Sequence, residues 1–188
     1  FRAMASPCRI VADDESLVVA GCELVEALER RWSRFRADSE ISALNRATGA
    51  LCIASDLTFD LIARAQLARD RTGGWFNPLV LDRLEALGYG APPQHGETAP
   101  TIVCQEPIEL LPDVLGVRLP MGARFDPGGI GKGLAADLVV EHLVALGATT
   151  VQVELGGDVR LVGENWTGGP WHVRIQSPVD HTQTIGHA

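Results

Sequence analysis

The sequence predicts an α+β fold in which helices pack against mixed or antiparallel sheets. Apolar residues recur with a helical period in the longer segments, whereas apolar and polar residues alternate in several short ones. The helical segments precede the strands or lie between them, and tight turns such as Gly156–Gly157 join consecutive strands. Because tight turns join antiparallel neighbours, an α+β arrangement is expected rather than a doubly wound parallel sheet.

The N-terminal half is predicted to be mainly helical. Ser39 is a suitable cap for one helix, and Ser55 or Asp56 for the next, which Gly73 and Gly74 would close. A polar loop from Ser33 to Ser39 contains a single aromatic residue, Phe35. The predicted elements are a strand at Cys8–Ala12 and helices at Glu15–Trp32, Ser39–Ala47, Leu57–Arg71 and Leu79–Leu87.

The second half is predicted to contain most of the strands and one long helix. Residues 91–100, APPQHGETAP, form the clearest loop and mark a lobe boundary if the domain has two lobes. The turn Pro120–Gly122 would join the first two strands of this half. The predicted elements are strands at Val114–Leu119, Ala123–Asp126, Thr149–Leu155, Val159–Val162 and Trp171–Gln176, and a helix at Ile130–Leu146.

Composition excludes several classes of function. The 188 residues are 46% hydrophobic and 21% charged, which is typical of a globular protein, and the net charge is −8. Nucleic-acid binding is not expected, because such proteins carry excess Lys and Arg to meet phosphates. No apolar run is long enough to span a membrane. The four cysteines form no C-x-x-C pair, which argues against a cysteine-based zinc site.

The stretch from Phe125 to Gly133, FDPGGIGKG, carries the strongest functional signal. It lies between a predicted strand and a predicted helix, where unpaired N–H groups and the helix dipole favour an anion. Glycines allow close approach of the backbone and positive φ angles. Lys132 places a cation where the dipole disfavours it, which suggests a bound anion, and Asp126 could accept from a ribose hydroxyl or ligate a metal.

One other interpretation of this turn is excluded and two stay open. It lacks the glycine and hydroxyl positions of a Walker A loop. Residues 131–136, GKGLAA, match a dinucleotide fingerprint weakly, with Glu154 as the later acidic residue of a Rossmann unit. The glycines could also simply make a tight connection. A second turn, Gly156–Gly157–Asp158, has two interpretations. It is either an ordinary hairpin turn, or it places Glu154 and Asp158 in the same cleft as Lys132.

Taken together, these residues resemble the ApbE-like family, the FAD:protein FMN transferases. The resemblance covers nearly the whole chain in the family's order. The matching segments are Met4–Pro7, Trp32–Ser42 with Asn45, Thr72–Pro78, and Asp126, Gly128–Gly129–Ile130, Lys132–Gly133, Asp137 and Gly156–Gly157–Asp158. The resemblance implies an ApbE-like (T-fold-like) α+β domain over residues 1–188.

The resemblance also implies the ligands of this domain. FAD would be the substrate, and a Mg²⁺ ion at its pyrophosphate would take the backbone carbonyl of Gly129 as one ligand. Phe35 would lie against a ring system. The implied FAD-contacting residues are Met4, Phe35, Trp75, Phe76, Asn77, Asp126 and Lys132. Spacing alone would instead place Trp75 and Phe76 in the core.

This sequence departs from the family pattern at three of these positions. Phe35 replaces the usual Tyr, Asn77 replaces the usual Asp, and Trp75 replaces a small residue. The family's remaining Mg²⁺ ligands, an Asp and a Thr, lie in a C-terminal part beyond residue 188, so we expect the domain to lack that part. These departures favour FAD binding over turnover.

The implied activity is Mg²⁺-dependent transfer of FMN from FAD to a Thr or Ser hydroxyl of a client protein, with release of AMP. The alternatives are an FAD-binding module, an FAD pyrophosphatase without protein transfer, a Rossmann-type NAD(P) oxidoreductase, and a structural domain without a ligand. A nearby carboxylate would take the hydroxyl proton, but the sequence does not identify it. The histidines show no triad-like or metal-like spacing. Family members are often exported or membrane-anchored, but no leader is visible here, so a cytoplasmic location stays open.

Overall fold

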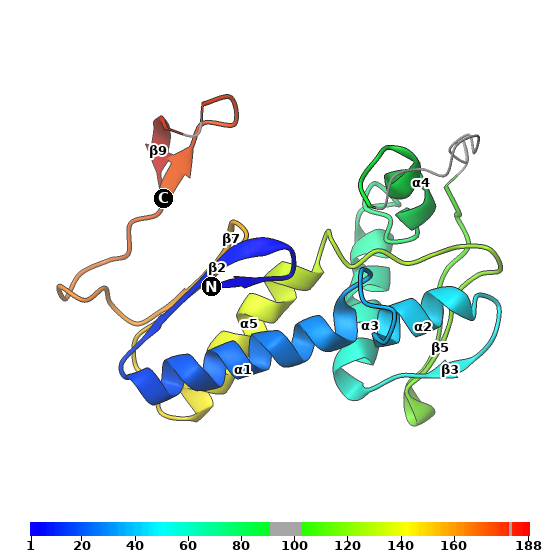
Figure 1. Ribbon diagram of the computed structural model, residues 1–188, viewed down its shortest axis with the longest axis horizontal. Helices are drawn as coiled ribbons and strands as arrows, with labels where there is room; N and C mark the ends of the chain where they lie inside the picture. Colours follow the sequence, from blue (N-terminus) through cyan, green and yellow to red (C-terminus); the bar gives the residue numbers. More distant parts are fainter. Residues whose placement is uncertain (91–102, 181) are drawn as a thin grey trace.

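The computed structural model describes residues 1–90, 103–180 and 182–188 and confirms the predicted α+β class (Figure 1). The helices are α1 Glu15–Trp32, α2 Glu40–Arg46, α3 Asp56–Arg71, α4 Leu81–Ala86, α5 Gly131–Ala145 and the 3-10 helix η1 Pro112–Val114. The strands are β1 Arg2–Ala3, β2 Ser6–Ala12, β3 Cys52–Ile53, β4 Glu109–Leu111, β5 Gly116–Arg118, β6 Val151–Leu155, β7 Asp158–Val162, β8 Arg174–Gln176 and β9 Thr184–His187. The predicted lobe boundary at residues 91–100 lies outside the described residues.

Every described strand pair is antiparallel, as the tight turns predicted. The largest sheet has the order β1-β2-β6-β7, so the N-terminal strand β2 pairs with β6 from the second half of the chain. The register places Cys8 opposite Leu155. A smaller sheet has the order β3-β5-β4, and the hairpin β8-β9 stands apart at the C-terminal end (Figure 1).

One part of the core lies between the largest sheet and the helices α1 and α5, which pack on each other and on the sheet (Figure 1). The same buried cluster continues into α2, α3 and β5. In β6 the residues Val151, Val153 and Leu155 alternate inward and are fully buried. Each such side chain contributes about 1.5–3 kcal/mol of hydrophobic free energy. This packing fixes the start of α5 and the end of β6 against each other, and both lie at the candidate site.

The predicted helix caps are confirmed at two serines. The Oγ of Ser39 accepts from the N–H of Ser42 at 3.0 Å, and the Oγ of Ser55 accepts from the N–H of Thr58 at 3.4 Å. Such contacts satisfy one of the unpaired donors at a helix start. The Ser39 cap fixes the end of the loop between α1 and α2, and Phe35 of this loop lines a cavity together with the first residues of α5.

The predicted strand at Ala123–Asp126 is wrong. The Asn45 side chain takes the place of a strand partner: its Nδ2 donates to the carbonyl of Phe125 at 2.9 Å, and its Oδ1 accepts from the N–H of Phe125 at 2.7 Å. The next N–H, that of Asp126, donates to the carbonyl of Pro78 at 2.8 Å. The segment is thus anchored without a ladder, and the short strands β1, β3, β4 and β9 were not predicted.

Candidate functional site

The turn before α5 leaves three backbone donors unpaired. Among the described residues, no acceptor meets the N–H groups of Gly129, Lys132 and Gly133. The positive end of the α5 dipole lies behind them, because Gly131 is the first residue of that helix. Unpaired N–H groups at a helix N-terminus form a binding site for an anion such as a phosphate.

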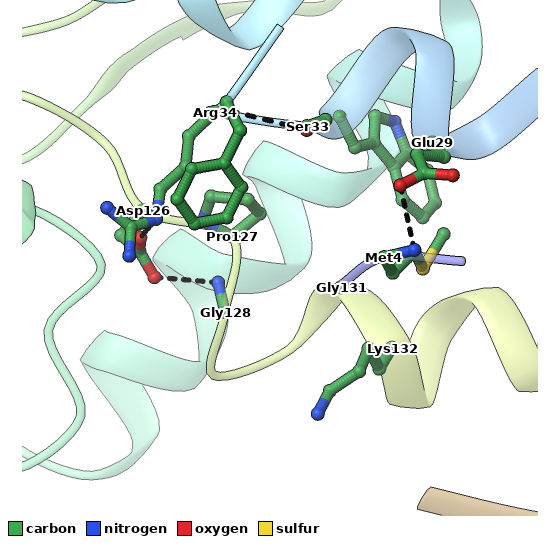
Figure 2. A pocket seen from close by; sticks show the side chains of 11 residues that line it. Met4, Glu29, Ser33, Arg34, Asp126, Pro127, Gly128, Gly131 and Lys132 are labelled. Carbon is green, nitrogen blue, oxygen red and sulfur yellow. Dashed lines mark hydrogen bonds and ion pairs between the residues drawn. The ribbon is translucent and has the colours of Figure 1, made fainter. Parts of the chain in front are cut away.

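The rest of the turn is held by its own hydrogen bonds. The N–H of Gly128 donates to Oδ1 of Asp126 at 2.8 Å, and the N–H of Gly131 donates to the carbonyl of Pro127 at 2.7 Å. Figure 2 shows Asp126 and Gly128 joined in this way at the edge of a pocket. The donors that remain free are therefore presented by a turn whose shape is already fixed.

The glycines of this turn are required for space and not for unusual backbone angles. None of Gly128, Gly129 and Gly131 has a positive φ, contrary to the expectation from the sequence. A Cβ at Gly128 would lie 2.6 Å from Oδ1 of Asp126. A Cβ at Gly129 would lie 2.7 Å from Cε2 of Phe76. Both distances are too short for a side chain to be added without displacing a neighbour.

Lys132 is the only lysine in the 188-residue sequence. Its Nζ lies 3.5 Å from the carbonyl oxygen of Gly156, so it reaches from the first glycine turn to the second. The predicted meeting of the two turns at one end of the sheet is therefore confirmed. Asp158 lies there too, but Glu154 is opposite Arg9 in the sheet and lines none of the three cavities around the turn.

Three adjoining cavities surround the first glycine turn. The first encloses about 210 Å³ and is lined by Met4, Phe35, Asp126 and Lys132 among others. The second encloses about 650 Å³ and shares Asp126 with the first; its lining includes Trp75, Phe76, Asn77 and Gly129. The third, of about 420 Å³, shares Gly129 with the second and lies between α3 and α5. The structure thus brings all eight predicted site residues to cavities that meet at this turn.

The aromatic residues around the turn differ in exposure. Trp75 is 95% exposed at the mouth of the second cavity, which excludes the core position that spacing alone suggested. Phe35 is 64% exposed in the first cavity. Phe76 is half-buried against Gly129 and so belongs partly to the core. Exposed rings beside an anion site are suited to stacking on the flat ring of a ligand.

Met4 and Asn77 hold their positions through backbone contacts. Met4 has a positive φ of 51°, and its N–H donates to Oε1 of Glu29 at 2.8 Å (Figure 2). The Nδ2 of Asn77 donates to the carbonyl of Cys104 at 2.9 Å, and its Oδ1 accepts from the N–H of Leu79 at 2.9 Å. A carboxylate at position 77 could not donate to Cys104, which gives a physical reason for Asn at this site.

Arg34 is a site residue that sequence reasoning missed. Its Nε lies 2.9 Å from Oδ2 of Asp126, and both side chains are largely buried. The N–H is not aligned on that oxygen, so the contact is an ion pair and not a well-formed hydrogen bond. Arg34 also lies over the ring of Phe35, with 4.4 Å between the guanidinium carbon and the ring centroid. The signal available in the sequence was an arginine beside an aromatic residue in a polar loop.

The residues available to a metal are few. The carbonyl of Gly129 accepts no hydrogen bond from the described part of the chain, which leaves it open to a cation. However, no three His, Cys, Asp or Glu residues in that part lie close enough together to hold a metal ion. The described residues therefore do not form a complete site for Mg²⁺, which usually takes carboxylates and phosphates as ligands.

The fold and the site define an α+β protein with a glycine turn that presents unpaired N–H groups between cavities lined in part by aromatic rings. The sequence profile of the ApbE family matches residues 4–187, and the chain belongs to that family. Within residues 1–90, 103–180 and 182–188, no helix is both long enough and apolar enough to cross a membrane.

The chain is similar to several FAD:protein FMN transferases. The one from Vibrio cholerae is 28% identical over 178 residues, which cover 89% of this chain and 53% of that protein. The one from Klebsiella pneumoniae is 30% identical over 199 residues, which cover 97% of this chain and 59% of that protein. The chain therefore spans little more than half the length of these curated relatives.

Solved structures of the family share the fold. The flavin transferase ApbE from Vibrio cholerae superposes with a TM-score of 0.83 at 25% identity, covering 98% of this chain and 65% of that one. The ApbE protein from Thermotoga maritima superposes with a TM-score of 0.87 at 21% identity, covering all of this chain and 65% of that one. These likenesses confirm the predicted ApbE-like α+β architecture.

Proposed function

We propose that this chain binds FAD with the pyrophosphate on the turn before α5, and that it serves the transfer of FMN from FAD to a protein. The observation that carries the proposal is the group of three unpaired N–H donors beside Lys132, between cavities with exposed aromatic rings. A dinucleotide offers two phosphates flanked by two flat ring systems. The names of the curated relatives support FAD as that dinucleotide.

In the proposed reaction, the hydroxyl oxygen of a Thr or Ser in an acceptor protein bonds to the phosphorus of the FMN half. The bond from that phosphorus to the bridging oxygen breaks, AMP leaves with that oxygen, and the hydroxyl proton is released. The turn contributes by positioning the pyrophosphate and by stabilising its charge, which are the main sources of catalysis in phosphoryl transfer. Lys132 adds a full positive charge to the N–H groups of the turn.

We propose that Mg²⁺ binds to this site only together with FAD. Bound with FAD, the ion would meet the free carbonyl of Gly129 and would neutralise phosphate charge. The described residues add no further cluster of ligands, so the phosphate oxygens of FAD would supply most of the remaining contacts to the ion. Accordingly, we expect Mg²⁺ to tighten FAD binding and not to bind measurably on its own. Calorimetric titration of Mg²⁺ with and without FAD distinguishes these two cases.

The test combines binding, AMP release and acceptor labelling. Purified protein is incubated with FAD and Mg²⁺, with and without a threonine-containing acceptor peptide, and AMP is measured by chromatography. We expect FAD to bind and AMP to appear together with a flavin-labelled peptide. FAD binding with no AMP under any condition would reject transfer, and binding of NAD(P) but not FAD would reject the proposal altogether.

The second candidate is an FAD-binding module that does not transfer FMN. It is favoured by the lack of a metal-ligand cluster in the described residues and by Asn77, whose amide is committed to Cys104 and Leu79. AMP release without labelled peptide would instead indicate an FAD pyrophosphatase. A Rossmann-type oxidoreductase finds no support, because GKGLAA lies inside α5 and every described strand pair is antiparallel.

A further inference from the structure

Arg34 contacts both the ring-lined cavity and the glycine turn. Its guanidinium faces the Phe35 ring on one side and the Asp126 carboxylate on another. Its Nη2 also donates to the carbonyl of Tyr89 at 2.8 Å, just after α4. Figure 2 shows Arg34 and Asp126 against each other at one edge of the first cavity, with Gly128 next in line.

The two oxygens of Asp126 divide their contacts between Arg34 and the turn. Oδ1 accepts from the N–H of Gly128, whereas Oδ2 is paired with Arg34. Asp126 is 7% exposed, so water cannot easily replace either partner. Removing the cation would leave a buried carboxylate with one uncompensated oxygen, which is strongly unfavourable. The carboxylate would then rotate or attract another donor, and the turn held by Oδ1 would shift with it.

The Phe35 ring depends on the same guanidinium. Phe35 is mostly exposed, and its backbone N–H donates to Oγ of Ser33 at 3.3 Å. The cation at 4.4 Å from the ring centroid is an attractive contact that favours this orientation of the ring. A planar guanidinium can stack on a ring and pair with a carboxylate at the same time, which a lysine ammonium cannot do equally well.

We infer that Arg34 is a positioning residue that couples the ring-binding cavity to the phosphate-binding turn. Arg34 acts through Phe35 on the ring-binding cavity and through Asp126 on the turn. The two parts of the site are therefore already in place relative to each other before a dinucleotide binds. The inference rests on the proposed FAD binding. Its consequence is that the contributions of Phe35 and Asp126 to FAD affinity depend on each other, and that this dependence requires Arg34.

The first measurement compares FAD affinity, by calorimetry, in the wild type, R34Q and R34K. Charged contacts of this kind correspond to about a tenfold change in affinity or more. We expect R34Q to weaken FAD binding about tenfold and R34K to restore only part of the loss. R124Q is the matched control, because Arg124 pairs with Asp82 and Glu85 but lines none of the three cavities. R124Q should lower Tm without changing FAD affinity.

The second measurement tests coupling directly. FAD affinities of F35A, D126N and the double variant are measured in the wild-type and R34Q backgrounds, with Tm recorded for each protein. We expect the two effects to be non-additive, by about threefold or more, when Arg34 is present, and additive in R34Q. If R34Q does not fold, the same cycle is run in R34K, where we expect a reduced coupling.

Three results would overturn the inference. FAD affinity could be unchanged in R34Q, the coupling could persist in full without Arg34, or R124Q could weaken FAD binding as much as R34Q. A wild-type protein that binds no FAD would reject the proposed function, and this inference with it. Because wild-type binding is measured first, failure of the inference is distinguished from failure of the proposed function.

Discussion

The two glycine turns that meet at Lys132 contain glycine for different physical reasons. In the turn before α5, the backbone angles of Gly128 and Gly129 are accessible to any residue, but a Cβ at either position would collide with Asp126 or Phe76. In the turn between β6 and β7, Gly156 and Gly157 have φ angles of 60° and 97°. A Cβ at Gly156 would also lie 2.6 Å from Oγ of Ser6, so this position is restricted by space as well as by backbone conformation. No atom lies within 4 Å of a Cβ at Gly157, so only its backbone conformation requires glycine.

The first turn therefore requires glycine because of its neighbours alone, whereas the second requires it for its backbone conformation and, at Gly156, for space as well. The first turn packs closely on its neighbours, and three of its N–H groups have no partner among the described residues, which leaves them available to an anion. The second turn joins two antiparallel strands and follows the twist that hairpins prefer. A glycine pair in a sequence therefore does not by itself show which kind of turn is present.

The largest effect is expected at the residue that links the two turns. Lys132→Ala should weaken FAD binding about ten- to hundredfold, because a charged hydrogen-bonding group to phosphate is lost. Lys132→Arg should retain part of the affinity. The control is Arg160→Ala on β7, where the arginine pairs with Asp137 and lies outside the three cavities. Calorimetry measures all three, and equal affinity in the wild type and Lys132→Ala would contradict the phosphate site.

The second prediction concerns space in the first turn. Gly129→Ala should destabilise the protein by about 1–3 kcal/mol, since the new methyl group overlaps the Phe76 ring. The double variant Gly129→Ala/Phe76→Ala should lose less than the sum of the two single variants. Gly133→Ala is the control, because its Cβ would meet only Asp158 at 4.0 Å. Denaturant unfolding gives the free energies, and strict additivity would show that the contact with Phe76 is not the cause.

The third prediction concerns conformation in the second turn. Gly157→Ala should destabilise the protein by about 1 kcal/mol, the cost of a left-handed backbone for an ordinary residue. Gly157→Asn should cost less, because asparagine tolerates this conformation. No neighbouring side chain contacts a Cβ at position 157, so no second substitution to a smaller residue should restore the lost stability, in contrast to position 129. An Asn variant that is less stable than the Ala variant in thermal unfolding would count against this explanation.

The smallest effect is expected at the opposite end of β6 from the second turn. Hydrogen bonds from the backbone N–H groups of Thr149 and Thr150 and from the Thr149 hydroxyl lower the pKa of Asp13. A lowered folded-state pKa adds stability above the unfolded pKa of about 3.9, and this stability is lost as pH falls through the folded pKa. Asp13→Asn should therefore lower Tm slightly at pH 7, and the difference should vanish in acid. A Tm difference that stays constant from neutral to acidic pH would exclude this origin.

The helices and their serine caps could be predicted because they depend on local spacing. Ser39 and Ser55 act on N–H groups three residues away, within the reach of a sequence pattern. The segment 123–126 could not be predicted, because its backbone is held by the side chain of Asn45 and by Pro78 instead of a neighbouring strand. Extended residues with an alternating pattern form a strand only if a partner strand is present.

Only part of the candidate site could be proposed from local sequence pattern. Asp126 and Lys132 follow from their place at the start of a helix, whereas the roles of Met4, Phe35, Trp75 and Gly129 came from the family resemblance alone. Arg34 was missed because its contacts with Asp126 and Tyr89 join segments far apart in the sequence. No local period or motif encodes such a contact, so it could be found only from the folded structure.

Lys132 offers a site for selective chemical modification of the turn before α5. Because the 188 residues contain no other lysine, Lys132 is the only side chain among them that reagents for primary amines can acylate. Modification of that side chain, located by peptide mass mapping, therefore reports whether the turn before α5 is open. The same uniqueness makes the turn a place where one dye or one cross-linker can be attached without mutation, directly beside the proposed pyrophosphate.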